Sequence, residues 1–364
     1  VHIPDLSDDN PLLLITGSAE TPSRDMMRYL KETGLAGDSQ QVLDVLQLDG
    51  KNDIDLSFKV PLSKGDPELN GSLALLDNEL KIDSWGLQFS KITGLLNFDR
   101  KGFHADKIHA SFNDRYVDIG VKTTAPDGGE SHTYIKASGL ADLSRIIESR
   151  NPGLANQLSG EAPFEVLIDI PEESASNLTI SSSLVGTELK FPYPFNKSIS
   201  DKLGFNLKTG FSGKEGETIV FELEDRLHAL LTIHPRSRQV TSAYVSLGND
   251  DIKQASGPDE LVIGGRLDYI DIVAWKEWFR RNLEAFSRAD ENSTFSSFKV
   301  DMQFDQLKYS RWLVEDLNVD AASNGKLWSA DLGGHGAQGM ITFETGDQKH
   351  ILNIDLQYLS LLKA

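Results

Sequence analysis

The sequence contains no cysteine. This absence excludes a disulfide-stabilised scaffold, a thiolate zinc site, an iron–sulfur cluster and a cysteine nucleophile. Long hydrophobic runs are missing as well, because the longest ones, such as residues 11–15 and 227–233, are far too short to span a bilayer. The first residues lack the basic and apolar pattern of a signal peptide. Because the chain begins at Val1 rather than at a methionine, we expect it to be a segment of a longer protein.

Positive charge is also scarce. The 364 residues include 36 Lys and Arg against 55 Asp and Glu, which gives a formal net charge of −19 at pH 7. Such an acidic surface repels phosphate backbones, so we expect no nucleic-acid partner. Hydrophobic residues make up 39% and charged residues 25% of the chain, which is typical of a folded protein of one large domain or several ordinary ones.

Apolar and polar residues alternate with a period of two along much of the chain, which predicts half-buried β-strands. The clearest examples are residues 54–60, 164–170 and 298–304. Turn signals such as Asp77-Asn78 and Asn113-Asp114 follow at short intervals. A parallel sheet would need a crossover helix between successive strands, and the sequence indicates too few helices for that. We therefore predict a mainly β fold built from antiparallel strands.

Three helices are predicted, at residues 23–33, 142–149 and 271–289, and each follows a strand. The first of these strands, residues 12–16, is separated from its helix by a predicted turn. Each helix is followed by another alternating strand, and this recurrence is typical of a repeat protein in which each unit completes the core of its neighbour. The predicted units form one continuous elongated sheet and cover residues 1–133, 134–260 and, truncated, 261–364.

The sequence offers no catalytic constellation. Residues 334–339 match the dinucleotide-binding pattern G-x-G-x-x-G, but they lie between two predicted strands with no helix to receive a pyrophosphate. The eight histidines are scattered and show no metalloprotease spacing. Carboxylates are plentiful, yet none stand out as an acid–base pair. We therefore expect a protein that is not an enzyme and that needs no metal or cofactor.

The 271–289 helix has two interpretations. Its aromatic residues Trp275, Trp278 and Phe279 lie beside basic residues, which is the pattern of a helix at a membrane surface. We favour a helix that packs its aromatic residues across the end of a sheet, because the helices at equivalent places carry no comparable aromatic cluster.

A sheet with one apolar face needs a cover, and the predicted helices are too short to supply it. Tight closure would give a sandwich or a barrel. An open arrangement would leave a long groove that could hold hydrocarbon chains. Alternation alone does not distinguish these two architectures.

Several segments resemble the YhdP family, the large AsmA-like envelope proteins of Gram-negative bacteria. The segments are residues 48–62, 85–98, 158–171 and 182–197, the last of which contains the run Leu189-Lys190-Phe191-Pro192-Tyr193-Pro194-Phe195-Asn196-Lys197. The resemblance implies an elongated sheet folded into a hydrophobic groove, the AsmA/TamB-like β-taco. It also implies a periplasmic protein, anchored in the inner membrane outside this segment, that lets phospholipid acyl chains slide between the inner and outer membranes.

With this architecture, the alternating apolar positions of three strands are the candidate lipid-contacting residues. They are Ile54, Leu56, Phe58, Val60, Phe164, Val166, Ile168, Phe298, Val300, Met302 and Phe304.

Two alternatives remain open. A scaffold or chaperone for outer-membrane protein assembly would use the same repeats but would bind through strand edges. A glycan-binding or glycan-cleaving protein would need exposed aromatic side chains above paired carboxylates. Trp85, Trp312 and Trp328 could serve such a role, although their strand context predicts burial.

Overall fold

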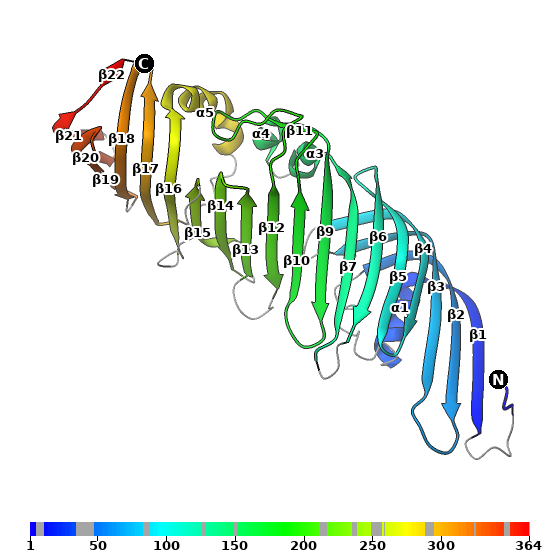
Figure 1. The fold of residues 1–364 in the computed structure, drawn as a ribbon. Helices are drawn as coiled ribbons and strands as arrows, with labels where there is room; N and C mark the ends of the chain where they lie inside the picture. Colours follow the sequence, from blue (N-terminus) through cyan, green and yellow to red (C-terminus); the bar gives the residue numbers. More distant parts are fainter. Residues whose placement is uncertain are drawn as a thin grey trace. The chain divides into compact units, whose positions relative to one another are not determined.

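The computed structural model describes the chain except for residues 5–10, 34–46, 83–86, 126–128, 149–150, 212–216, 235–238, 249–256, 258, 288–294, 324, 346–349 and 364. The described residues form 22 strands and four helices (Figure 1). Twenty strands belong to one hydrogen-bonded sheet that is not closed into a barrel, and β8 and β11 form a separate pair. The prediction of a mainly β, open fold is therefore confirmed.

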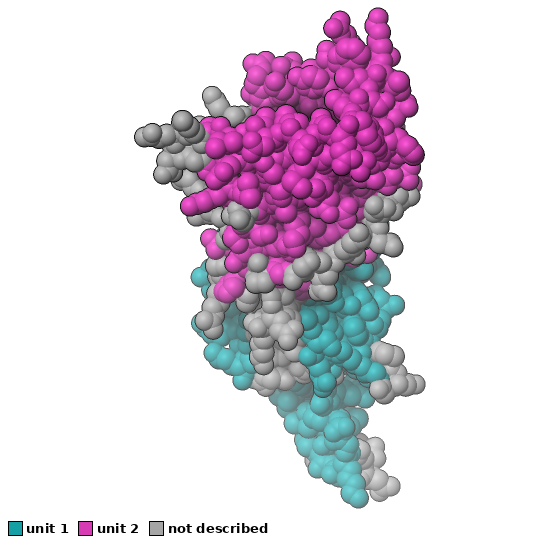
Figure 2. All heavy atoms as spheres, turned by 90° about the vertical axis from the view of Figure 1, so that its left-hand side faces the viewer, with its two compact units in different colours: residues 1–141, 164–179 teal, residues 142–163, 180–364 magenta. Residues whose placement is uncertain are grey.

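The chain divides into two compact units, coloured teal and magenta in Figure 2. Unit 1 comprises Val1–Ala141 and Phe164–Thr179. Its strands and single described helix are β1 (Leu12–Pro22), α1 (Ser23–Thr33), β2 (Gln47–Pro61), β3 (Glu68–Ile82), β4 (Leu87–Asp99), β5 (Gly102–Phe112), β6 (Arg115–Thr124), β7 (His132–Ala141), most of β9 (Ala162–Pro171) and the first half of β10 (Ser176–Ser182). Strands β1 to β7 pair consecutively and antiparallel.

Unit 2 comprises Asp142–Pro163 and Ile180–Ala364. Its elements are α3 (Leu143–Glu148), α4 (Pro152–Ala155), β8 (Leu158–Gly160), β11 (Thr187–Leu189), β12 (Phe205–Phe211), β13 (Glu217–Leu223), β14 (Leu227–Ile233), β15 (Val240–Leu247), β16 (Glu260–Asp271), α5 (Ile272–Ser287), β17 (Ser297–Tyr309), β18 (Trp312–Ser323), β19 (Leu327–Gly333), β20 (Ala337–Thr345), β21 (His350–Leu359) and β22 (Leu362–Lys363). The division into three repeats, with boundaries after residues 133 and 260, stays a prediction.

The sheet is mixed rather than wholly antiparallel, which corrects the prediction. In unit 2, β16 runs parallel to both β15 and β17. Helix α5 provides the physical reason for the second pair, because it lies between β16 and β17 in the chain and serves as the crossover that parallel neighbours require. The equivalent segment of unit 1 differs, since β1 and β2 flank α1 but pair antiparallel.

Two predicted turns are absent because the strands continue through them. Strand β1 extends to Pro22, and β3 continues through Asp77-Asn78 to Ile82. At Asp77-Asn78 the ladder contains a bulge, with Asp77 at a positive φ of 61°. The Asn78 side chain accepts a hydrogen bond from the Leu76 backbone N–H at 2.7 Å. Asparagine and aspartate are common in both turns and bulges, so the Asp77-Asn78 pair marks a bulge here and not the predicted turn.

A buried polar cluster fixes α1 to the sheet of unit 1. Ser23 Oγ accepts hydrogen bonds from Asn52 Nδ2 at 2.7 Å and from Asn78 Nδ2 at 2.6 Å, and Asn78 also donates to Asn52 Oδ1 at 2.9 Å. All three side chains are fully buried, and Met26 of α1 is buried with them. Because buried polar groups must be paired, this cluster specifies one position for the start of the helix.

The two tryptophans of α5 pack within unit 2, whereas Phe279 is 49% exposed. Trp275 contacts Phe195 at 6.0 Å between ring centroids, and Trp278 contacts Phe191 at 5.5 Å. The two indole N–H groups donate to the Tyr193 backbone carbonyl and to the Gln157 side chain, each at 3.0 Å. The packed interpretation of this helix is therefore confirmed for both tryptophans.

Candidate functional site

Within the glycine-rich segment at 334–339, residues 334–336 form the turn between β19 and β20 and residues 337–339 begin β20, in keeping with the predicted strand context. A Cβ atom at Gly334, Gly336 or Gly339 would come within 2.2–2.3 Å of a backbone carbonyl oxygen. These glycines therefore allow close approach of neighbouring backbones, which is the structural role that the pattern has here.

The four candidate residues of β2 lie on one side of the unit 1 sheet. Direct pairing places Ile54 beside Leu73, and Phe58 beside both Ile15 and Leu69. The β2 candidates Ile54, Leu56, Phe58 and Val60 are half-buried, so part of each side chain remains accessible. We call this side of the sheet, defined by Ile15, Phe58 and Leu69, the unit 1 apolar face.

The β9 candidates are more deeply buried. Val166 is 5% and Ile168 is 3% exposed, whereas Phe164 is half-buried and contacts Phe112 at 6.1 Å between ring centroids. Val166 and Ile168 therefore pack against protein neighbours and offer almost no free surface. Their contact with lipid stays a prediction.

The β17 candidates lie on one side of the unit 2 sheet. Phe298, Val300 and Phe304 are half-buried, and Met302 is buried. Across the neighbouring ladders, the Val300 position continues into a row of apolar side chains, one from each strand. The row is Val300, Ala321, Ala330, Ile341 and Ile354. We call this side of β17 to β21 the unit 2 apolar face.

A second row runs beside the first on the same face. It consists of Phe298, Ser323, Trp328, Phe343 and Leu352. Exposure increases toward β21, from half-buried Phe298 to 37% exposed Phe343 and 58% exposed Leu352. In the first row Ile354 is also 58% exposed. Sequence reasoning missed the β19–β21 residues, although period-two alternation is present at 328–332, 341–343 and 352–356.

The other side of the same strands is acidic. Direct pairing aligns Asp301 of β17 with Asp320 of β18 and Asp331 of β19, and all three residues are exposed. Each of these aspartates directly follows or precedes a residue of the unit 2 apolar face in its strand. The strands are therefore amphipathic, with carboxylates in water on one side and hydrocarbon on the other.

Charged and polar pairs likewise occupy the opposite side of the unit 1 sheet. His132 Nδ1 lies 2.8 Å from Asp169 Oδ1, and Lys107 Nζ lies 3.0 Å from Asp118 Oδ2. The hydrogen bond from Lys107 lowers the pKa of the Asp118 carboxyl and raises the pKa of Lys107. Among the residues that the structure describes, no group of three or more His, Asp or Glu side chains is arranged to hold a metal ion.

Two of the tryptophans proposed for glycan contact are more exposed than predicted. Trp312 and Trp328 are each 37% exposed, so the expectation of core burial is wrong for both. Trp312 lies under the Arg311 guanidinium at 5.4 Å, and Trp328 packs on Phe298. Trp85 lies outside the described residues.

These observations define an amphipathic β-sheet protein whose sheet is open and whose apolar side chains remain partly exposed. Within the described part of the chain, no helix is both long enough and apolar enough to cross a membrane.

The chain belongs to the YhdP protein family, which it matches over residues 1–364. It is also similar to a protein of Escherichia coli (strain K12) described as the intermembrane phospholipid transporter YhdP, with 23% identity over 227 residues. That alignment covers 61% of this chain and 17% of the relative, so this chain spans a small part of the relative's length. No solved structure matches the chain.

Proposed function

We propose that this segment is a non-enzymatic part of a phospholipid conduit. In this proposal acyl chains lie against the apolar faces while the protein, anchored in the inner membrane through other parts of its chain, bridges the periplasm between inner and outer membranes. The description of the Escherichia coli relative supports the substrate class. The observation that carries the proposal is the exposed hydrocarbon of β19 to β21, with Leu352 and Ile354 each 58% exposed.

The apolar side of the sheet replaces part of the hydrocarbon that surrounds an acyl chain in a bilayer. Removal of a CH₂ group from water contributes about 0.8 kcal/mol. A lipid headgroup can stay in water at the same time, because only the acyl chains need apolar contact. An exposed apolar surface such as that of β19 to β21 promotes aggregation unless it binds a ligand or a partner, and its presence therefore favours a functional role.

Movement along such a face needs no specific chemical step. Hydrophobic contact is non-directional, and neighbouring strands offer nearly equivalent apolar side chains roughly 4.8 Å apart. The two rows that start at Val300 and Phe298 provide such a series across five strands. A bound acyl chain could therefore exchange contacts in small steps with low barriers.

Lipid extraction followed by mass spectrometry on the purified chain tests the proposal. The informative pair is Ile354→Asp and Asn353→Asp, because the two residues are adjacent on β21, face opposite sides and receive the same charge. Both positions are exposed, so both variants are expected to fold. We expect co-purified phospholipid with the wild type and with Asn353→Asp, and less with Ile354→Asp.

Absence of phospholipid from the wild type, together with no uptake of a fluorescent phospholipid, would contradict the proposal. The scaffold interpretation would then gain weight, because pairing through backbone edges does not depend on the side chain of Ile354.

A further inference from the structure

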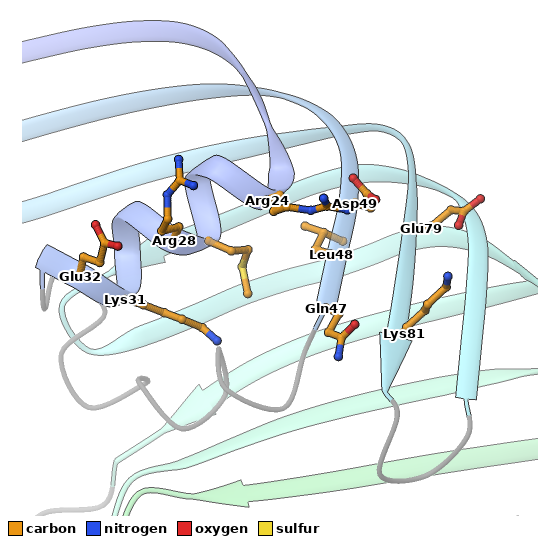
Figure 3. A pocket seen from close by; sticks show the side chains of 10 residues that line it. Arg24, Arg28, Lys31, Glu32, Gln47, Leu48, Asp49, Glu79 and Lys81 are labelled. Atoms are coloured by element: carbon orange, nitrogen blue, oxygen red, sulfur yellow. Dashed lines mark hydrogen bonds and ion pairs between the residues drawn. The ribbon is translucent and has the colours of Figure 1, made fainter.

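A hollow of about 480 Å³ lies between α1 and the adjoining ends of β2 and β3 in unit 1 (Figure 3). Its volume lies within the range of roughly 300–1,000 Å³ that is usual for small-molecule sites. Met27 and Leu48 supply apolar contact, and the remaining lining residues are charged apart from Gln47. The lining of this hollow is mostly charged, unlike that of the apolar faces, and therefore favours a polar ligand.

Four cationic side chains line this hollow. Arg24, Arg28 and Lys31 follow one another at i, i+4 and i+7, so they share one side of α1, and Lys81 of β3 lies across from them (Figure 3). In the whole chain acidic residues outnumber basic ones by 55 to 36, whereas the hollow holds four basic residues and three acidic ones. Basic residues are therefore not outnumbered at this place, and the charges are equal when Asp25, the partner of Arg28, is included.

The three carboxylates are Glu32, Asp49 and Glu79. Asp49 lies 2.9 Å from the Arg24 guanidinium, and Arg28 pairs at 2.8 Å with Asp25 of its own helix. Each guanidinium has five N–H donors, so a single carboxylate partner leaves donors for a further anion. Glu79 of β3 and Glu32 of α1 can accept hydrogen bonds from an ammonium group.

The geometry points to this α1 hollow as a binding site for a phosphate ester that carries its own amine, the chemistry of a zwitterionic phospholipid headgroup. The assignment to a lipid rests on the proposed function. The basic residues attract the phosphate, while the carboxylates attract the amine and disfavour a bare polyanion. The site thus differs from a simple phosphate site in preferring a ligand with both charges.

Titration with soluble glycerophosphoethanolamine, followed by phosphorus NMR, tests the inference, with inorganic phosphate as the comparison ligand. We expect glycerophosphoethanolamine to bind more tightly than inorganic phosphate. Arg28→Gln and Lys81→Gln should each weaken its binding roughly two- to fivefold, as expected for loss of one exposed charge pair. Glu79→Gln should reduce the preference over inorganic phosphate, and Lys101→Gln, in the β4–β5 turn, serves as the control.

Equal affinity for the two ligands, or unchanged affinity in both Arg28→Gln and Lys81→Gln, would overturn the inference. Its failure is distinguishable from failure of the conduit proposal. Ile354→Asp should reduce phospholipid uptake and leave glycerophosphoethanolamine binding unchanged, because Ile354 belongs to unit 2 and the hollow to unit 1. Headgroup binding without phospholipid uptake would support the site and contradict the conduit.

Discussion

The rings of Phe298 and Trp328 contact each other at 5.8 Å between centroids, although their strands, β17 and β19, are not neighbours. Ser323 of the intervening strand β18 lies between them in the same row and is 5% exposed. Two strands separated by a third lie roughly 9–10 Å apart, so the rings lean toward each other over the small serine. In this row a small side chain on β18 thus lies between large side chains on β17 and β19.

We predict that Ser323→Leu destabilises the protein by about 1–3 kcal/mol, because a larger side chain would force the Phe298 and Trp328 rings apart. The adjacent Ala322 is exposed on the opposite side, so Ala322→Leu should change the free energy of unfolding by less than about 0.5 kcal/mol. Urea unfolding of both variants measures the difference. Equal effects would contradict the proposed arrangement of the two rings over Ser323.

Removal of the Ser23 hydroxyl should lower the free energy of unfolding by more than the loss of a single exposed hydroxyl group would. Ser23→Ala leaves amide donors of Asn52 and Asn78 without their shared acceptor in a fully buried site, which costs about 1–3 kcal/mol. Ser18→Ala on the exposed part of β1 is the control and should cost less than about 0.5 kcal/mol. The measurement is the free energy of unfolding in urea. A neutral Ser23→Ala would show that the cluster does not fix α1.

Asp271 makes the start of α5 sensitive to acid. Burial acts to raise the pKa of this carboxyl, but hydrogen bonds from the Ala274 N–H and from Lys308 outweigh it, so the pKa is lowered. Because the folded-state pKa lies below the unfolded value of about 3.9, this group stabilises the fold above that value. The stabilisation is lost as the pH falls through the folded-state pKa.

We therefore expect the wild type to lose more stability than Asp271→Asn between neutral pH and about pH 3. Asparagine keeps the acceptor for the Val273 and Ala274 N–H groups, whereas Asp271→Ala removes it and should cost about 0.5–2 kcal/mol at neutral pH. Urea unfolding at each pH, followed by tryptophan fluorescence, measures the free energy of unfolding, and Trp275 and Trp278 of α5 are two of the five tryptophans that contribute to the signal. The same pH dependence in wild type and Asp271→Asn would contradict the prediction.

The row of aspartates opposite the unit 2 apolar face is a source of repulsion. Asp320 lies directly between Asp301 and Asp331, and like charges opposite each other are destabilising. Asp320→Asn should therefore raise the free energy of unfolding by about 0.2–1 kcal/mol at low salt, and by less at high salt. Asp355→Asn, whose partner in register is Met340, should have little effect. A destabilised Asp320→Asn protein would show that the carboxylate has a favourable partner.

Period-two alternation predicted the strands at residues 54–60, 164–170 and 298–304 and indicated which of their residues share a side. Ile54, Leu56, Phe58 and Val60 share one side of β2, and Phe298 and Val300 share one side of β17, because alternate residues of a pleated strand point to the same side. Alternation could not predict how deeply each residue is buried. Val166 and Ile168 are core residues, whereas Ile354 is largely exposed, and this difference depends on which other strands pack nearby.

Strand direction and strand ends were predicted less well. The parallel pairing of β16 and β17 depends on the path of the chain through α5, and a helix after a strand is compatible with either direction, as α1 shows. The Asp77-Asn78 signal indicated a turn because both residues favour one locally. The buried contact of Asn78 with Ser23, 55 positions away in the chain, explains why β3 continues instead. The α1 hollow was missed because Arg24, Arg28 and Lys31 alone resemble a solvated helix face, and only the fold brings residues of β2 and β3 beside them.

The most direct test of the conduit proposal uses the absence of cysteine, which permits single labels without background. A fluorophore is attached at Ile354→Cys or at Asn353→Cys, which lie on opposite sides of β21. Each labelled protein is then incubated with a phospholipid that carries a quencher on its acyl chain. We expect strong quenching at position 354 and weak quenching at position 353. Equal quenching at both positions, or none at 354, would contradict the claim that acyl chains lie on the unit 2 apolar face.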